Sequence, residues 1–313
     1  MLAYILRRVL ATLPVVAMVT LFVFSLLYLA AGDPAAIIAG DQATQVDIER
    51  IREQLGLHRS FPVRFVEWVG GLLRGDLGTS IFTRLPVAHM IAQRIEPTVS
   101  LMLVTLVFAV VVAVPLGVLA AARRGSAIDR AIMVFAVVGF SVPVFVVGYL
   151  LAWVVALQWS WLPVQGYTPF AKGFWPWLRH LILPAMALAT FYVALIARIT
   201  RSVMVEILQQ DYIRTARAKG AGQRAILFVH ALKNAAVPVV TVIGIGVALL
   251  ISGAVVTESV FAIPGLGRLT VDSILRRDYP VIQGLILVFS FAYVLINLMV
   301  DISYTFLDPR IRY

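Results

Sequence analysis

The feature that most constrains this chain is a series of apolar runs that contain no charged side chain. Five of them reach the roughly 20 residues that a bilayer core requires, and they cover residues 9–31, 97–122, 131–157, 235–257 and 279–300. A sixth run, residues 181–197, is shorter and contains Pro184. The chain has 61% hydrophobic residues, whereas soluble domains have about 45–50%. We therefore predict an all-α, multi-pass membrane protein with six transmembrane helices.

The distribution of charge predicts the orientation of these helices. If the N-terminus is inside, the inner segments hold 14 of the 26 Lys and Arg residues but only 5 of the 16 Asp and Glu residues. Because Lys and Arg concentrate in cytoplasmic loops, we expect both termini to be cytoplasmic. We expect one transmembrane domain, 1–313, with an outer loop at 32–96 and a basic cytoplasmic loop at 198–233. The net charge of +10 then reflects orientation, and no nucleic-acid partner is expected.

The basic loop contains a segment, DYIRTARAKG at residues 211–220, that predicts a short helix. Asp211 is the expected N-cap, residues 212–219 form about two turns, and Gly220 takes the left-handed position after the end. Tyr212, Thr215 and Ala216 share one side at i, i+3 and i+4 spacing. Since an isolated helix of this length is marginal in water, contacts must hold it. A helix tied to two spans in this way can act as a lever.

The sequence lacks the motifs that are typical of nucleotide-binding and metal-binding sites. No G-x-x-x-x-G-K-[ST] segment is present, so a P-loop cannot hold nucleotide phosphates here. The four histidines are scattered without the spacing of metal ligands, and there is no cysteine. We expect no catalytic residue, no metal site and no cofactor in this chain, and any ATP to be used by another chain.

Polar side chains in or near the apolar runs are candidates for a translocation path, because such groups are costly inside a membrane. Packing between helices explains the Tyr and Thr residues equally well, and the position of Glu258 near a span end favours a headgroup-level or inter-helix hydrogen bond. The glycines of residues 235–257 predict close approach of another helix. The candidates for the path are Ser141, Tyr149, Thr190, Tyr192, Glu258 and Gln283.

The segment 211–220, followed by HALKN at 230–234 and PVVT at 238–241, resembles the cytoplasmic "EAA" loop of ABC-importer permeases. Its form is that of the dipeptide, oligopeptide and nickel branch. Further pieces of the resemblance lie in order along the whole chain, and the outer loop resembles that of the first of two paired permeases. These pieces are YILRR (4–8), GDP (32–34), LGL (55–57), GDLG (75–78), SVP (141–143), TESVF (257–261), PGLG (264–267) and DPR (308–310).

The resemblance implies a type I importer permease of a bacterial inner membrane. It would pair with a homologous second permease and rest on two ATPase subunits that bind ATP and magnesium, while an extracytoplasmic solute-binding protein delivers the solute. Where the broad family has Glu-Ala-Ala, this chain has Arg214, Thr215 and Ala216, so one carboxylate is missing. The residues implied to couple the chain to the ATPase are Asp211, Tyr212, Arg214, Thr215, Ala216, Arg217, Lys219 and Gly220.

The leading hypothesis is therefore a permease subunit for ATP-driven uptake of di- or oligopeptides or a related small solute. An ion-coupled secondary transporter that works without ATPase subunits is the alternative. It predicts buried charge near the middle of the membrane, of which the apolar runs show almost none. A membrane enzyme would need a titratable constellation that the scattered histidines do not provide.

Overall fold

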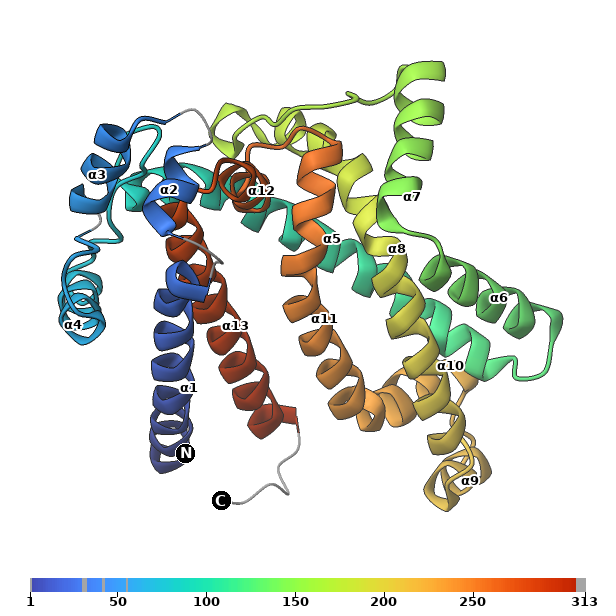
Figure 1. Cartoon of the computed structure of the whole chain (residues 1–313). Helices are drawn as coiled ribbons and strands as arrows, with labels where there is room; N and C mark the ends of the chain where they lie inside the picture. Colours follow the sequence, from blue (N-terminus) through green and yellow to red (C-terminus); the bar gives the residue numbers. More distant parts are fainter. Residues whose placement is uncertain (1, 30–32, 41–42, 55, 308–313) are drawn as a thin grey trace. The chain divides into compact units, whose positions relative to one another are not determined.

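The computed structural model describes residues 2–29, 33–40, 43–54 and 56–307 (Figure 1). Regular structure in these ranges is helical, apart from an isolated bridge between Thr79 and Pro86. The chain forms two compact units, Met1–Ile95 with Leu269–Leu295 and Glu96–Arg268 with Ile296–Tyr313. Helices α5 (Val87–Ala122), α12 (Leu266–Arg276) and α13 (Tyr279–Leu307) contribute residues to both. Two units can belong to one membrane domain, so a single domain over 1–313 stays a prediction.

Four helical segments among the described residues are long and apolar enough to cross a membrane: Val87–Ala122, Phe174–Ile207, Gln223–Val260 and Tyr279–Ser303. A fifth candidate is a pair of helices, Ala127–Ser141 and Val144–Gln158, that bends by 103°. The apolar stretch Leu10–Leu26 is shorter. The structure thus has four or five spans by length and composition, and the sixth, at the predicted first run, stays a prediction.

The bent pair differs from the continuous helix predicted for residues 131–157. Helix α6 (Ala127–Ser141) ends where the Val142 N–H donates to the Val138 carbonyl, and Pro143 precedes α7 (Val144–Leu151). Proline has no N–H and disfavours helical backbone at the residue before it, so the helix stops there. A π-helical segment, Ala152–Gln158, then completes the pair.

The first unit joins α1 (Leu2–Leu29) to α4 (Phe61–Leu72) through aromatic contacts. The Phe24 ring centroid lies 5.2 Å from that of Phe61 and 5.3 Å from that of Trp68. Gln283 of α13 donates its amide N–H to the Val23 carbonyl at 3.2 Å. The Ser80 hydroxyl and the Ile81 N–H both donate to Asp278, which fixes the segment before α5 to the start of α13.

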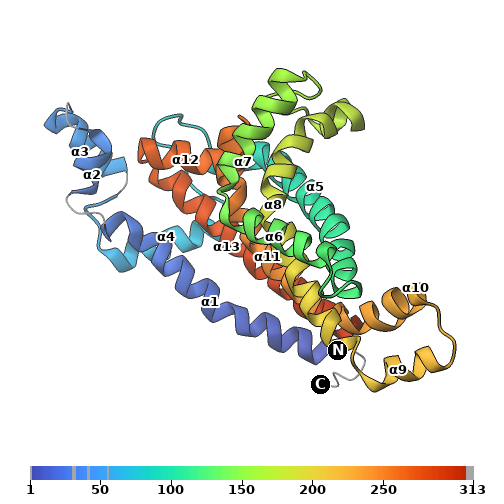
Figure 2. The same ribbon diagram turned by 90° about the vertical axis from the view of Figure 1, so that its right-hand side faces the viewer.

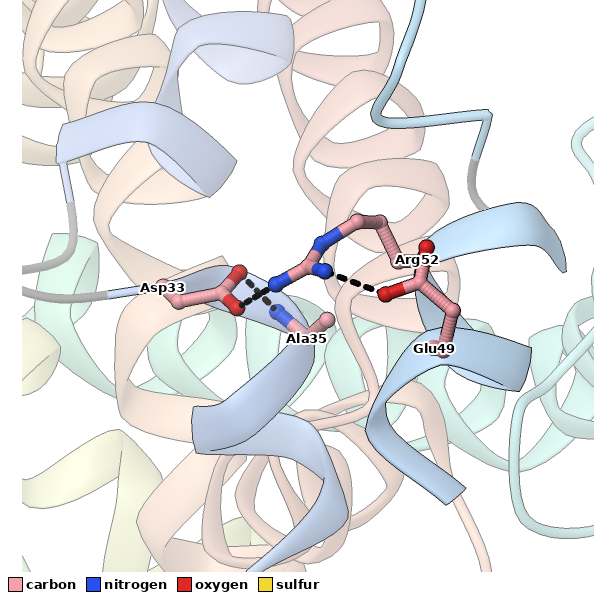
Figure 3. Close-up of polar contacts among 4 residues, drawn as sticks. All are labelled: Asp33, Ala35, Glu49 and Arg52. Atoms are coloured by element: carbon pink, nitrogen blue, oxygen red, sulfur yellow. Dashed lines mark hydrogen bonds and ion pairs between the residues drawn. The ribbon is translucent and has the colours of Figure 1, made fainter. Parts of the chain in front are cut away.

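Two short helices in this unit are held by one network of charges (Figure 3). Asp33 caps α2 (Pro34–Ala39) by accepting the Ala35 N–H at 3.0 Å, and it also accepts from Arg52 of α3 (Gln45–Gln54). Arg52 donates to Glu49 as well. The hydrogen bond to Asp33 raises the pKa of the Arg52 guanidinium. The network therefore joins α2 to α3.

The second unit is built around α8 (Phe174–Ile207), which packs against α6, α7 and α11 (Leu232–Val260). Glycines permit the closest approaches, as the sequence predicted for α11. A methyl group at Gly253 of α11 would lie 2.6 Å from Leu188, and one at Gly117 of α5 would lie 2.6 Å from Thr200. At Gly117 the methyl group would also lie 2.7 Å from the Ala197 carbonyl oxygen, so a larger side chain there would push α8 away from α5.

Candidate functional site

The predicted loop at 198–233 is more helical than its sequence suggests. Helix α8 continues to Ile207, a three-residue turn follows, and α9 covers Asp211–Ala218. The chain then returns through α10 (Gln223–Ala225) and a π-helical segment, Ile226–Ala231, into α11 (Figure 2). The α9 helix therefore lies between the ends of two membrane-length helices.

The predicted N-cap of α9 was wrong by one residue. Gln210 is the cap, with extended backbone at φ −69° and ψ 149°, and Asp211 is the first helical residue. Asp211 remains favourable there because a negative charge in the first turn complements the helix dipole. It pairs with Arg214 at 3.3 Å, and its carbonyl accepts the Thr215 hydroxyl.

The end of α9 confirms the predicted role of Gly220. Its φ is +85°, a left-handed conformation that side chains other than hydrogen disfavour. The Gly220 N–H donates to the Arg217 carbonyl at 2.9 Å, and the Ala221 N–H donates to the Ala216 carbonyl at 3.1 Å. These are the two bonds of a Schellman motif, which fixes the direction of the chain after the helix.

One residue, Ile213, attaches α9 to the rest of the second unit. Its side chain is 0% exposed and lies in a cluster with Met204 of α8, Ile226 and Ala231 before α11, and Val118 of α5. Three membrane-length helices thus converge on this isoleucine. Burial of an isoleucine side chain contributes about 1.5–3 kcal/mol, so the contact offsets the weak intrinsic stability of so short a helix.

The other side of α9 is exposed. Tyr212 is 44% exposed, Thr215 and the basic residues Arg214, Arg217 and Lys219 are exposed, and Ala216 is half-buried. The predicted face of Tyr212, Thr215 and Ala216 is therefore not what holds the helix within this chain. Sequence reasoning missed Ile213, although it is the one large aliphatic residue in 211–220.

An ion pair with a buried carboxylate joins α6 to α8. Arg201 of α8 binds both carboxylate oxygens of Asp129 in α6, at 2.5 and 2.7 Å. The Asp129 side chain is 4% exposed and also accepts the Gly125 N–H at 2.9 Å. The Ser126 hydroxyl in turn accepts the Asp129 N–H and caps α6. The turn between α5 and α6 is therefore tied to α8 about two turns before the end of that helix.

The candidates for a translocation path have different surroundings. Ser141 and Thr190 donate their hydroxyls to carbonyls of their own helices. Tyr149 is exposed and Tyr192 is buried against Gly246. Gln283 lies in the first unit, and Glu258 is fully buried in the second. The residues described here contain no group of three His, Asp or Glu side chains that could hold a metal ion. A role in the path stays a prediction for all six residues.

Comparisons with known proteins agree with this architecture. The family described as "Binding-protein-dependent transport system inner membrane component" matches residues 113–313, and its N-terminal component matches residues 1–102. The chain belongs to this family, the permease subunits of ABC importers, and is a multi-pass protein of the bacterial inner membrane. The resemblance inferred from the motifs is thereby confirmed.

Sequence matches to named relatives extend over nearly the full chain. This chain is 56% identical over 310 residues to a probable peptide ABC transporter permease protein, y4tP, of Sinorhizobium fredii, with 99% of each chain covered. It is 42% identical over 313 residues to the glutathione transport system permease protein GsiC of Escherichia coli, covering 100% of both chains. The dipeptide transport system permease protein DppB of Alkalihalophilus pseudofirmus is 40% identical over 333 residues, again with 100% of both covered.

A solved structure shows the same fold. The inward-facing MetNI methionine ABC transporter matches with a TM-score of 0.59 and 18% identity, covering 70% of this chain and 96% of that one. At this identity the likeness concerns the fold alone. The chain thus has the type I ABC importer permease fold.

Proposed function

We propose that this permease takes part in ATP-driven uptake of di- or oligopeptides or of a chemically related small solute. An extracytoplasmic solute-binding protein delivers the solute, and the chain works with a homologous second permease and two ATPase subunits. ATP and magnesium bind to those subunits, and this chain contributes no catalytic group. The names of the three relatives, which refer to peptide, glutathione and dipeptide transport, support the choice of solute class.

The observation that carries the coupling proposal is the two-sided character of α9. One side is fixed to α5, α8 and the start of α11 through Ile213, while Tyr212, Thr215 and the basic residues are exposed. A helix with such contacts can pass a displacement by a partner on to these helices without unfolding. Closure of the ATPase subunits would displace α9, and α8 and α11 would follow as rigid bodies.

The charge of α9 defines the chemistry of its partner surface. Three cations, Arg214, Arg217 and Lys219, stand against one anion, Asp211. In place of the usual Glu-Ala-Ala, the ATPase meets a guanidinium at position 214. We expect the facing surface of the ATPase to offer carboxylates or carbonyl oxygens to these donors.

Coupling also requires α9 to lie on the cytoplasmic side. We infer six transmembrane helices, of which the first contains the stretch Leu10–Leu26, so that both termini and α9 would lie on the cytoplasmic side. The excess of Lys and Arg in the inner segments supports this topology. Labelling of single cysteines from either side of the membrane would test it directly, because the natural chain has none.

The test of the function uses the complete transporter in proteoliposomes. Wild type is expected to hydrolyse ATP faster when loaded binding protein is present and to accumulate solute. Gly220→Pro, or Tyr212→Ala combined with Ala216→Glu, should abolish this stimulation, because they alter the end of α9 or its exposed face. Gly222→Ala is the matched control, since Gly222 has φ −67° and open space around it.

Two outcomes would contradict the proposal. Wild-type stimulation and uptake in both α9 variants would exclude docking through this helix. Uptake by the chain alone, driven by an ion gradient without ATP, would support the secondary transporter instead. The solute class is tested separately, by mass spectrometry of the ligand that co-purifies with the binding protein.

A further inference from the structure

A glutamate is buried at the C-terminal end of α11, far along the helix from α9. Glu258 is 0% exposed. Its Oε1 accepts the hydroxyl of Thr98 in α5 at 2.6 Å, and its Oε2 accepts the backbone N–H of Arg268 in α12 at 2.9 Å. One carboxyl group therefore joins the end of α11 to two other helices of the same unit.

These bonds provide hydrogen-bond acceptors for backbone N–H groups at the N-terminus of α12. The first N–H groups of a helix lack partners within it. Here the Leu266 N–H donates to the Thr98 hydroxyl oxygen at 2.8 Å, and the Arg268 N–H donates to Glu258. Thr98 thus accepts from α12 and donates to α11 with the same oxygen atom. The start of α12 is positioned by side chains from two other helices.

The glycines in the connection between α11 and α12 make room for this arrangement. A methyl group on Gly265 would lie 2.2 Å from Glu258 Oε1. One on Gly267 would lie 2.5 Å from the Cα of Val255 and 3.0 Å from Glu258 Oε2. Neither glycine has a positive φ, so lack of space, not backbone conformation, is what requires glycine there.

The same connection is held at further points. Phe261 and Ile263 are buried, and the Phe261 carbonyl accepts the Gly166 N–H at 2.9 Å. The Ile263 N–H donates back to the Glu258 carbonyl at 2.9 Å. The turn that follows α11 is therefore fixed along its length and offers little freedom to absorb a displacement of the helix.

We propose that Glu258 is a positioning residue of the transport cycle. It makes the end of α11, the start of α12 and the Thr98 region of α5 move as one body. When the N-terminal end of α11, next to Ile213, is displaced, α12 then moves with α11. Residues 261–265 do not absorb the displacement by changing their conformation. This inference rests on the proposed ATP-driven import.

Substitutions of Glu258 should have graded effects. Glutamine keeps the size of the side chain, and its oxygen can still accept the Arg268 N–H, but its amide group offers no acceptor to the Thr98 hydroxyl. Alanine removes both acceptors and leaves a cavity. Solute transported per ATP hydrolysed should therefore fall moderately in Glu258→Gln and about 5-fold or more in Glu258→Ala, within the usual range of coupling between sites.

A double-mutant cycle separates positioning from simple packing. Gly265→Ala should lower transport per ATP because its methyl group displaces the carboxyl group. In the Glu258→Ala background the same methyl enters vacated space, so the double variant should be no worse than Glu258→Ala alone. Glu96→Gln is the matched control, because that carboxyl of α5 binds Tyr167 and Phe170 and does not contact the start of α12.

The measurement is made on the complete transporter in proteoliposomes, with uptake, ATP hydrolysis and thermal unfolding recorded for each variant. Support requires a lowered transport-to-ATP ratio in assembled complexes, with stimulated hydrolysis retained. An unchanged ratio in Glu258→Gln and Glu258→Ala, even with a lower unfolding temperature, would overturn the proposal, as would an equal effect of Gly265→Ala with and without Glu258. Absence of ATP-driven uptake by wild type would instead refute the proposed function.

Discussion

The two ends of α11 are built in opposite ways. At the N-terminal end the helix begins after a π-helical segment, Ile226–Ala231, whose side chains Phe228 and Val229 are exposed. At the C-terminal end Thr257, Glu258 and Phe261 are buried and hydrogen-bonded or packed within the chain. The first end leaves large apolar side chains exposed, whereas the side chains of the second end have their contacts within the chain.

This difference shows where partners and motion belong. Segments that move or bind have few buried contacts and are drawn from the less stable parts of a protein. At the N-terminal end of α11 that character belongs to Phe228 and Val229, which are exposed, while Ile226 and Ala231 are buried with Ile213 of α9. The C-terminal end, by contrast, is buried and is hydrogen-bonded to α5 and α12. Substitutions test this difference between the two ends.

The largest effect is expected from Ile213→Ala. Loss of a fully buried isoleucine side chain costs about 2–5 kcal/mol, and the loss falls on the contact that holds α9. Hydrogen exchange of residues 211–220 should increase strongly, and stimulation of ATP hydrolysis should be lost. Ile274→Ala, at an exposed isoleucine of α12, serves as the control. Unchanged exchange at 211–220 in Ile213→Ala would show that α9 is held in another way.

The next effect is expected from Arg201→Ala, which leaves the buried Asp129 without its cation. Breaking a fully buried pair costs about 3–5 kcal/mol. Because the Arg201 side chain is 27% exposed, we expect about 2 kcal/mol, below the range of fully buried pairs. Thermal unfolding of the complex measures it. The double variant Arg201→Ala/Asp129→Ala should be no less stable than Arg201→Ala, and additive losses would contradict an ion pair as the cause.

A smaller effect is expected from Gly220→Ala. A residue with a side chain in the left-handed conformation costs about 1–2 kcal/mol, and Gly220 has φ +85° with open space around it. The cost should appear as faster hydrogen exchange in the last turn of α9. Gly222→Ala should leave exchange unchanged. Equal effects of the two substitutions would mean that the backbone conformation at 220 is not the cause.

The smallest effect is expected from Asp33→Ala in the first unit. Loss of a helix N-cap typically costs about 1 kcal/mol, and Asp33 caps α2 and pairs with Arg52. Hydrogen exchange should increase in α2 and α3 only. Helices α2 and α3 belong to the first compact unit and α11 to the second, so a change in ATP hydrolysis would show that the two ends of α11 are not independent of this region.

Much of the fold could be predicted from composition, and its interruptions could not. The apolar runs located the long helices, because length and lack of charge suffice to indicate a span. The 103° bend at Pro143 lies inside an apolar run where periodicity carries no boundary signal. The extension of α8 to Ile207 was missed because the predicted span ended at the first arginine, Arg198, and a helix can continue beyond the bilayer.

The candidate site, too, could be predicted only in part from the sequence. Gly220 was predicted because a single residue type reports the left-handed conformation. Ile213 was missed because its partners, such as Val118 and Ile226, are distant in sequence and only the fold brings them together. For the same reason the bond from Thr98 to Glu258, across 160 residues, has no local signature. Hydrogen-bond partners of this kind are a property of the tertiary structure.

A partner that covers the exposed side of α9 would shield a cysteine placed there. The natural chain contains no cysteine, so Thr215→Cys introduces a unique thiol on that side. In the complete transporter we expect this thiol to cross-link to an ATPase subunit and to be protected from a hydrophilic thiol reagent. Reaction with the reagent at the rate of the isolated permease, with and without ATP and with no cross-link formed, would contradict it.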